Sequence, residues 1–84
     1  MKEKIFSVYV IRSTETQKLY VGMATDIEKR LQQHNNGESD YTRPFIPWEL
    51  IYSEYTGDTI QARKLEKYYK STAGKNKLRK LKKL

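Results

Sequence analysis

Two short segments, about ten residues apart, limit the fold of this chain more than any other feature. Val8–Ile11 and Leu19–Gly22 are rich in β-branched and aromatic residues, and each contains a tyrosine. Such residues are typical of buried strands. The polar stretch between them, Ser13–Thr16, is short enough for a hairpin loop. We therefore expect two antiparallel strands over Ile5–Arg12 and Lys18–Gly22.

The hairpin also predicts how the two tyrosines lie. If Arg12 pairs with Gln17, Tyr9 falls directly opposite Tyr20. Opposite residues of an antiparallel pair share one face, with their β-carbons about 4.5–5.5 Å apart. The sequence thus predicts two tyrosines side by side on one face of a sheet.

Capping signals mark the starts of two helices. Thr25–Glu28 has the spacing of a capping box, and Gly37 is a typical residue to close the helix that follows. Asp58, with Gln61 three residues later, predicts the cap of a second helix that runs to about Ser71. Between the helices we expect a loop over residues 37–47 and then a third strand, Trp48–Tyr55, which alternates in its pattern.

The last residues predict a further short helix. Ala73-Gly74 is expected to break the chain, and leucines then recur at three-residue spacing, at Leu78, Leu81 and Leu84. The predicted fold class is α+β: a small three-stranded antiparallel sheet flanked by helices, in the order ββαβα with a short C-terminal helix. We expect one domain over residues 1–76, followed by a basic tail or short helix over residues 77–84.

Composition limits the class of protein. A domain of 84 residues without cysteine must be held together by packing alone. No apolar run approaches the ~20 residues that span a membrane, and the first residues do not resemble a secretion signal. We therefore expect a cytoplasmic protein with no membrane partner.

The net charge of +7 is concentrated at the C-terminal end. Six basic residues lie among the last ten, which leaves 11 basic and 10 acidic residues in the rest of the chain. A cationic segment on a nearly neutral body favours a polyanionic partner, most commonly nucleic acid, although a solubilising terminus has the same composition. The six residues are Lys75, Lys77, Arg79, Lys80, Lys82 and Lys83.

Five residues in this arrangement could cleave a phosphodiester bond, because the ββαβα order is expected to place the tyrosines, Arg30 and Glu66 on one sheet face. Glu66 lies on the apolar stripe of the second helix, where it could hold Mg²⁺ or form an ion pair along the helix. Arg30 could stabilise a phosphate, and His34, four residues later, could transfer protons. Tyr9 and Tyr20 could activate a water molecule. Ordinary packing or surface roles remain the alternative for each of these residues.

The order of these motifs resembles the GIY-YIG nuclease superfamily, and in particular its small single-domain bacterial branch. The two strand motifs, Val8-Tyr9-Val10 and Tyr20-Val21-Gly22, are similar to those that name the family. The similarity continues over about residues 5–76, with Arg30, Gln33-His34-Asn35, Tyr41-Thr42-Arg43 and Glu66. Two residues depart from the pattern: Val8 replaces a glycine, and Met23 stands where some members have lysine.

The resemblance implies a role for each residue. Tyr20 resembles the tyrosine proposed to activate the attacking water, with Tyr9 beside it. Arg30 resembles the arginine that contacts the scissile phosphate, and Glu66 resembles the sole protein ligand of a divalent metal, Mg²⁺ or Mn²⁺. His34 matches a histidine of some branches.

The resemblance also implies the activity. We expect a metal-dependent endonuclease that cuts DNA, including branched, flapped or damaged strands in repair, by a single-metal mechanism. Arg43 and the six C-terminal basic residues would bind the nucleic acid, and a protein partner could supply substrate specificity. The alternatives are a weak or inactive nucleic-acid-binding module of the same fold, and a protein-interaction domain with a basic tail.

Overall fold

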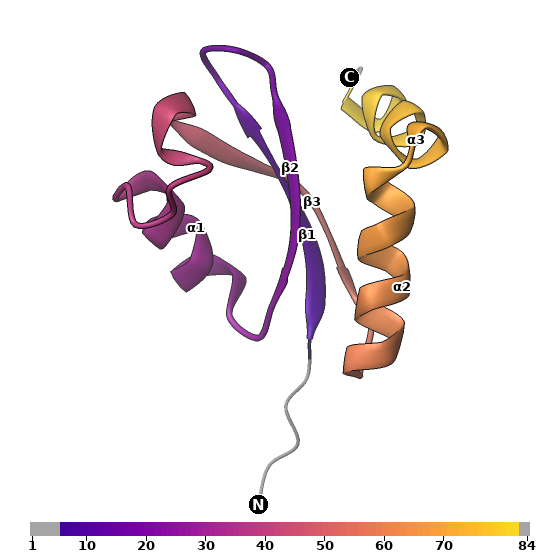
Figure 1. Ribbon diagram of the computed structural model, residues 1–84. Helices are drawn as coiled ribbons and strands as arrows, with labels where there is room; N and C mark the ends of the chain where they lie inside the picture. Colours follow the sequence, from indigo (N-terminus) through magenta and orange to yellow (C-terminus); the bar gives the residue numbers. More distant parts are fainter. Residues whose placement is uncertain (1–5, 83–84) are drawn as a thin grey trace, which may run out of the picture.

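The structure is an α+β fold with one antiparallel sheet between two helical layers (Figure 1). The computed structural model describes residues 6–82, and side chains for residues 6–80. In chain order its elements are β1 (Ser7–Ser13), β2 (Leu19–Ala24), α1 (Ile27–Asn35), a 3₁₀ turn η1 (Arg43–Phe45), β3 (Trp48–Tyr55), α2 (Thr59–Lys70) and α3 (Thr72–Lys82). The predicted ββαβα order and the C-terminal helix are confirmed.

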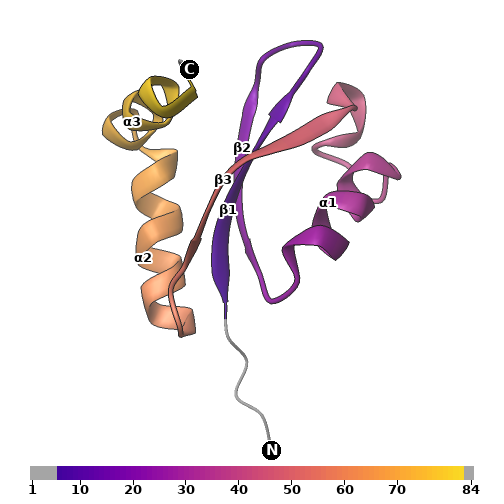
Figure 2. The same cartoon turned by 180° about the vertical axis from the view of Figure 1, so that it is seen from behind.

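The central strand of the sheet is β1, with β2 and β3 as its two edges. Because side chains alternate along a strand, β1 contributes to two separate cores. Val8 and Val10 pack with Ala62, Tyr69 and Leu78 of α2 and α3. The opposite face, described next, packs against α1. Figure 2 shows the same arrangement from behind, with α1 on one side of the sheet and α2–α3 on the other.

The face toward α1 is formed by Tyr9 and Ile11 of β1 together with Trp48 at the start of β3. Helix α1 contributes Ile27 and Leu31 to this core. This face therefore contains both tyrosines of the predicted strand motifs, Tyr9 and Tyr20. We had expected Glu66 to share the same sheet face; that expectation is wrong, because α2 covers the opposite face (Figure 1).

The predicted register of the hairpin is also wrong, by two residues. Tyr9 pairs with Gly22, and Tyr20 pairs with Ile11. The turn is longer than expected because Ser13 N–H donates to Lys18 O at 2.9 Å and Gln17 adopts a positive φ of 69°. Since the shift is an even number of residues, both tyrosines still lie on one face.

Helix α1 begins one residue later than the capping box predicts. Asp26 is the N-cap, and its carboxylate accepts a hydrogen bond from Lys29 N–H at 3.1 Å. Aspartate is a stronger N-cap than threonine, so it takes the role from Thr25. The predicted cap of the second helix is confirmed, because the Asp58 carboxylate accepts a hydrogen bond from Gln61 N–H at 2.8 Å. Gly37 follows the end of α1 with a φ of +80°, as predicted for a residue that closes a helix.

The predicted break at Ala73-Gly74 is wrong, because the chain turns at Ser71 and Gly74 lies inside α3. Gly74 is needed where α3 crosses the end of α2. A β-carbon there would lie 2.1 Å from the carbonyl oxygen of Tyr68 and 2.6 Å from the Cα of Tyr69. Leu78 is buried against the sheet, whereas the side chain of Leu81 and all of Leu84 lie outside the described residues.

Gly74→Ala is therefore expected to destabilise the domain by about 1–3 kcal/mol, the usual cost of overpacking. Urea unfolding followed by circular dichroism measures the change. Lys77→Ala, on an exposed position of the same helix, is the matched control and should leave the midpoint nearly unchanged. A Gly74→Ala variant as stable as the parent would show that α3 can move away from α2 without cost.

Candidate active site

Tyr9 lies beneath the centre of the candidate site and cannot be reached by solvent. It is 1% exposed, and its ring lies over Gly22 on the neighbouring strand. A β-carbon at Gly22 would lie 2.6 Å from the Tyr9 hydroxyl oxygen, so only glycine leaves room for the phenol. The glycine of the second strand motif thus has a packing reason: it allows the Tyr9 hydroxyl to lie over the edge strand β2.

A buried chain of hydrogen bonds joins Tyr9 to the loop after α1. The Tyr9 hydroxyl is 2.9 Å from Nε2 of His34, and Nδ1 of His34 is 2.8 Å from Oγ1 of Thr42. Trp48 Nε1–H in turn donates to the backbone carbonyl of Thr42 at 2.9 Å. Tyr9, His34 and Thr42 are all almost fully buried. The chain fixes the Tyr9 hydroxyl and ties β1, α1 and the loop together.

Burial determines the protonation states in this chain. Burial, followed by the neighbouring Tyr20, raises the pKa of Tyr9 to about 12, although the charge of Arg30 opposes the rise. Burial also lowers the pKa of His34, and the positive charge of Arg30 lowers it further. Both groups are therefore neutral near pH 7. In neutral imidazole one ring nitrogen donates and the other accepts, which suits the two partners of His34.

The lowered pKa of His34 predicts that acid weakens the fold. Below about pH 6.5, where a histidine in an unfolded chain takes up a proton, the unfolded state binds more protons than the folded one. The free energy of unfolding should therefore fall from about pH 7 toward pH 5, by at most about 1.4 kcal/mol per pH unit. Urea unfolding across this range measures the slope.

His34→Gln provides the control, because His34 is the one histidine of the chain. The variant should be less stable than the parent at pH 7 and should lose the slope between about pH 7 and 5.5. An equal slope in both proteins would assign the acid sensitivity to other groups.

Tyr20 is the accessible tyrosine of the pair. It is half-buried, and its ring centroid lies 6.4 Å from that of Tyr9 and 5.0 Å from that of His34. Tyr41 and Trp48 flank it at 5.8 and 6.4 Å. Within residues 6–82 its hydroxyl forms no hydrogen bond, in contrast to that of Tyr9. Tyr20, unlike Tyr9, is therefore partly exposed and has a hydroxyl that is not engaged by the described residues.

Arg30 projects from α1 beside these tyrosines. Its guanidinium donates to the side-chain oxygen of Gln33 at 2.7 Å. It also lines a cavity of about 330 Å³, together with Met23 at the end of β2 and Lys29 on α1. The positive charge of Arg30 lowers the pKa of His34 and opposes the rise in the pKa of Tyr9.

Glu66 approaches the site from the other helical layer. Its side chain is 24% exposed, and Oε2 lies 3.2 Å from Nζ of Lys70, one turn later on α2. The negative charge of Glu66 also contributes, as the smallest cause, to raising the pKa of Tyr9. Tyr9 lies over Gly22 on one face of the sheet, and α2 packs against β2 on the other face. The two helical layers therefore approach each other at the edge formed by β2.

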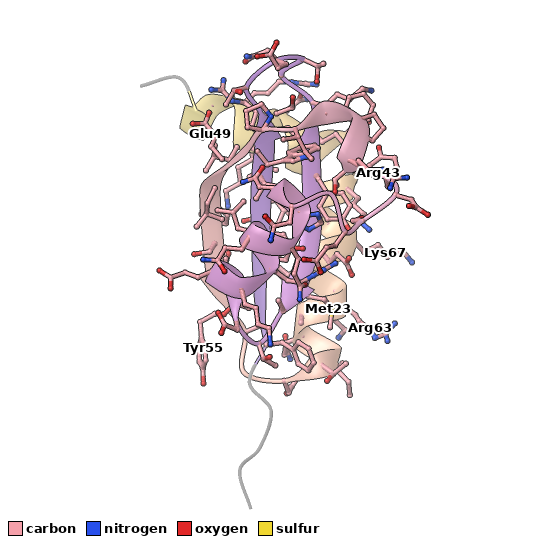
Figure 3. All side chains as sticks on the ribbon, turned by 90° about the vertical axis from the view of Figure 1, so that its left-hand side faces the viewer. Met23, Arg43, Glu49, Tyr55, Arg63 and Lys67 are labelled. Atoms are coloured by element: carbon pink, nitrogen blue, oxygen red, sulfur yellow. The ribbon has the colours of Figure 1, made fainter. Side chains whose placement is uncertain are left out.

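Figure 3 views the molecule from the α1 side and shows both sheet edges. Met23 of β2 lies along one margin with Arg43, Arg63 and Lys67, whereas Glu49 and Tyr55 of β3 mark the other. Because Met23 and Arg30 line the same cavity, the labelled cations Arg63 and Lys67 of α2 lie at the margin where that cavity opens.

A carboxylate in this setting fits a divalent metal that is shared with the substrate. No cluster of three or more potential ligands occurs among residues 6–82, so the protein offers no preformed cage there. Mg²⁺ is commonly bound by one or two carboxylates, with waters and substrate phosphate oxygens completing its shell. Glu66 could supply the single protein carboxylate of such a shell when Lys70 moves away from it.

The predicted nucleic-acid-binding residues lie in two places. Arg43 is at the start of η1, where its exposed guanidinium forms an ion pair with Asp40 at 3.1 Å. Helix α3 carries four exposed cations with described side chains: Lys75, Lys77, Arg79 and Lys80. The side chain of Lys82 and the whole of Lys83 lie outside the described residues.

Sequence reasoning missed two supports of the site. Thr42 is fully buried against His34, and Asn35 fastens the start of β3 to α1. The Asn35 side chain accepts from Trp48 N–H at 2.7 Å and donates to Trp48 O at 3.0 Å. Asn35 and Thr42 belong to the runs Gln33-His34-Asn35 and Tyr41-Thr42-Arg43. The spacing of these runs in the sequence does not indicate that Thr42 contacts His34 or that Asn35 binds Trp48.

The sequence and the fold of this chain are similar to those of known proteins. A family model described as the GIY-YIG catalytic domain matches residues 5–79. A UPF0213 protein of Bacillus licheniformis is 38% identical over 72 residues, which are 84% of this chain and 74% of that protein. One of Staphylococcus saprophyticus is 36% identical over 73 residues, or 86% and 88% of the two chains.

A solved structure is similar as well. The solution NMR structure of a UPF0213 protein from Bacillus halodurans matches with a TM-score of 0.56 and 27% sequence identity. The match covers 93% of this chain and 85% of that one.

Among the helices formed by residues 6–82, none combines the length and the hydropathy that a membrane-spanning helix needs.

Proposed function

Because the chain belongs to the GIY-YIG catalytic domain family, we propose that it is a metal-dependent endonuclease that hydrolyses phosphodiester bonds in DNA. One observation carries the proposal: an accessible phenol, Tyr20, lies beside a buried hydrogen-bond chain and an arginine at an open sheet edge. The buried chain from Tyr9 through His34 to Thr42 holds the first tyrosine in a fixed position beside Tyr20.

The two tyrosines take different roles in this proposal. Tyr9 has a pKa raised to about 12 and a hydrogen-bonded hydroxyl, so it stays neutral and holds its position. Tyr20 is partly exposed and would take the proton of the attacking water while its own phenolic proton passes to solvent. His34 does not touch the substrate; it is a positioning residue that orients Tyr9 through Nε2 and is itself held by Thr42.

Arg30 would bind the phosphate that is cleaved. A guanidinium can donate two parallel N–H groups to phosphate oxygens. Its charge is already in place before the reaction, so it stabilises the negative charge that builds up in the transition state without further reorganisation. The cavity that Arg30 lines also contains Lys29, which adds to the positive potential there.

Glu66 would hold the divalent metal, Mg²⁺ or Mn²⁺, at the same edge. A metal bound there would polarise a phosphate oxygen and offset its charge. The Glu66 side chain is partly exposed and its partner, Lys70, is flexible and more exposed still. Lys70 can therefore turn away into solvent when the carboxylate binds the metal.

Cleavage assays on branched and linear DNA, with Mg²⁺, Mn²⁺ or EDTA, test the proposal. We expect cleavage with either metal and none with EDTA. Binding without cleavage under all conditions would contradict nuclease activity and support a binding module instead. Met23, which replaces a lysine of some relatives beside the Arg30 cavity, is the residue to change first in that case.

A further inference from the structure

A second cavity, of about 460 Å³, opens between the β1–β2 hairpin and α3. Part of its lining is apolar: Leu19 of β2, Ile51 of β3 and Leu78 of α3. Leu78 is 1% exposed, so this side of the cavity belongs to the protein core and is rigidly supported. The cavity therefore offers an apolar floor that a flat ring could cover.

The rest of the lining is strongly positive. Arg12, Lys18, Lys75 and Arg79 line the cavity, and no aspartate or glutamate of the described chain does so. Arg12 already binds Glu49, whereas Lys75 has no ion pair within residues 6–82. Since Lys75 and Arg79 are four residues apart on α3, they present their charges on one side of the helix. An anion would be attracted to this wall.

Tyr41 connects this cavity to the candidate active site. It lines the cavity and is 62% exposed, yet its ring is held between Tyr20, at 5.8 Å, and Phe45, at 6.4 Å. Tyr20 is the residue to which the proposed function assigns the attacking water. A group that occupies the cavity against Tyr41 would thus lie next to the bond that is cut.

We propose that this cavity binds an unpaired nucleotide of the substrate strand, an inference that rests on the proposed function. The base stacks on Tyr41 over the apolar floor, and the adjoining phosphate lies at Lys75 and Arg79. Cations alone would suffice to hold the outside of a duplex. An aromatic ring, an apolar floor and a cationic wall together are the combination that binds single strands.

The proposal narrows the substrate class. A base inside a duplex is stacked on both sides and cannot offer its face to Tyr41 unless it is extruded, at a cost of a few kcal/mol. Single strands, flaps and frayed ends contain free bases already. The enzyme should therefore prefer nucleic acid with an unpaired nucleotide beside the cleaved bond.

Binding of a fluorescent oligothymidine, compared with a duplex of the same length, tests the proposal by anisotropy in EDTA. Tyr41→Ala should weaken single-strand binding about tenfold, as loss of one base–aromatic stack does, and should affect the duplex far less. Tyr41→Phe keeps the ring and should bind like the parent. Lys75→Gln and Arg79→Gln should each lower the salt slope for the single strand by about 0.7.

Two variants serve as matched controls. Lys64→Gln removes the same charge from an exposed position of α2 that does not line the cavity. Tyr55→Ala removes a tyrosine that is 67% exposed at the β3 margin (Figure 3). Both should bind the single strand like the parent. If Lys64→Gln costs as much affinity as Lys75→Gln, or a folded Tyr41→Ala variant costs none, the nucleotide does not occupy this cavity.

The assay separates this inference from the proposed function, because no cleavage occurs in EDTA. If the protein binds single strands through Tyr41 but cuts nothing when metal is added, the proposed nuclease activity is contradicted and the assignment of the cavity to an unpaired nucleotide stands. A protein that cuts DNA but binds oligonucleotides without regard to Tyr41 would retain the activity and lose the cavity assignment.

Discussion

Glu66→Gln is expected to lower the rate of DNA cleavage at least about a thousandfold while the domain stays folded. A metal ion supplies several kcal/mol of transition-state stabilisation, and each 1.4 kcal/mol corresponds to a factor of about ten in rate. Glutamine keeps the size of the side chain but binds a hard cation poorly. Single-turnover cleavage at saturating Mg²⁺ measures the effect.

The structure provides a matched control in Lys70, the partner of Glu66 at 3.2 Å. Lys70→Gln breaks the same ion pair but keeps the carboxylate, so it should cleave at a rate close to that of the parent. Exposed pairs at this helix spacing contribute only about 0.3–0.5 kcal/mol, and both variants should therefore melt near the parent temperature. Equal loss of activity in both would mean that the ion pair matters and the metal site lies elsewhere.

Tyr20→Phe should have the next largest effect, a fall in cleavage rate of about 10²–10³, the usual result of removing one preorganised polar group. Phenylalanine keeps the ring that packs against His34 and Trp48. Because the Tyr20 hydroxyl forms no hydrogen bond within residues 6–82, stability should hardly change. Parallel measurements of cleavage rate, DNA affinity and urea unfolding separate the three effects.

Tyr9→Phe is the informative comparison for this experiment. It leaves Nε2 of the buried His34 without its partner, which should cost about 1–3 kcal/mol of stability. Its effect on cleavage should be indirect and smaller than that of Tyr20→Phe. If instead Tyr9→Phe abolishes cleavage and Tyr20→Phe is as active as the parent, the roles of the two tyrosines are reversed.

Local signals in the sequence predicted most of the architecture. Alternation of residue types predicted the strand Trp48–Tyr55, and the structure has this strand. One side chain, that of Asp58, predicted the start of α2, and it is the N-cap of that helix. The break assigned to Gly74 failed because glycine has two uses. A sequence shows its freedom of backbone conformation, but not that a neighbouring helix passes within 2.1 Å of where a β-carbon would be.

Long-range geometry was harder to predict. The hairpin register depends on a positive φ at Gln17, a conformation that glutamine rarely adopts. The sheet face of Glu66 depends on which way the chain crosses after β3, and no residue near Glu66 encodes this. The order of elements alone suggested one face, whereas the structure joins the two layers at the β2 edge.

The residues of the candidate site were easier to name than to connect. Tyr9, Tyr20, Arg30, His34 and Glu66 come from short motifs that can be found in one sequence. That His34 is a buried link between Tyr9 and Thr42 follows only from packing. Tyr41 was named only as part of the Tyr41-Thr42-Arg43 run and was given no role, because its position between Tyr20 and a cavity becomes visible only in the fold.

The open edge of β2 has a consequence for how this domain can assemble with others. Strands at the edge of a sheet readily pair with a strand of another chain. In the proposed function Tyr20, Arg30 and Glu66 act at this edge, so a strand added to β2 is expected to obstruct cleavage. An active dimer or fusion must instead extend the sheet through β3 or use the outer helical surfaces. A partner strand that added to β2 would act as an inhibitor.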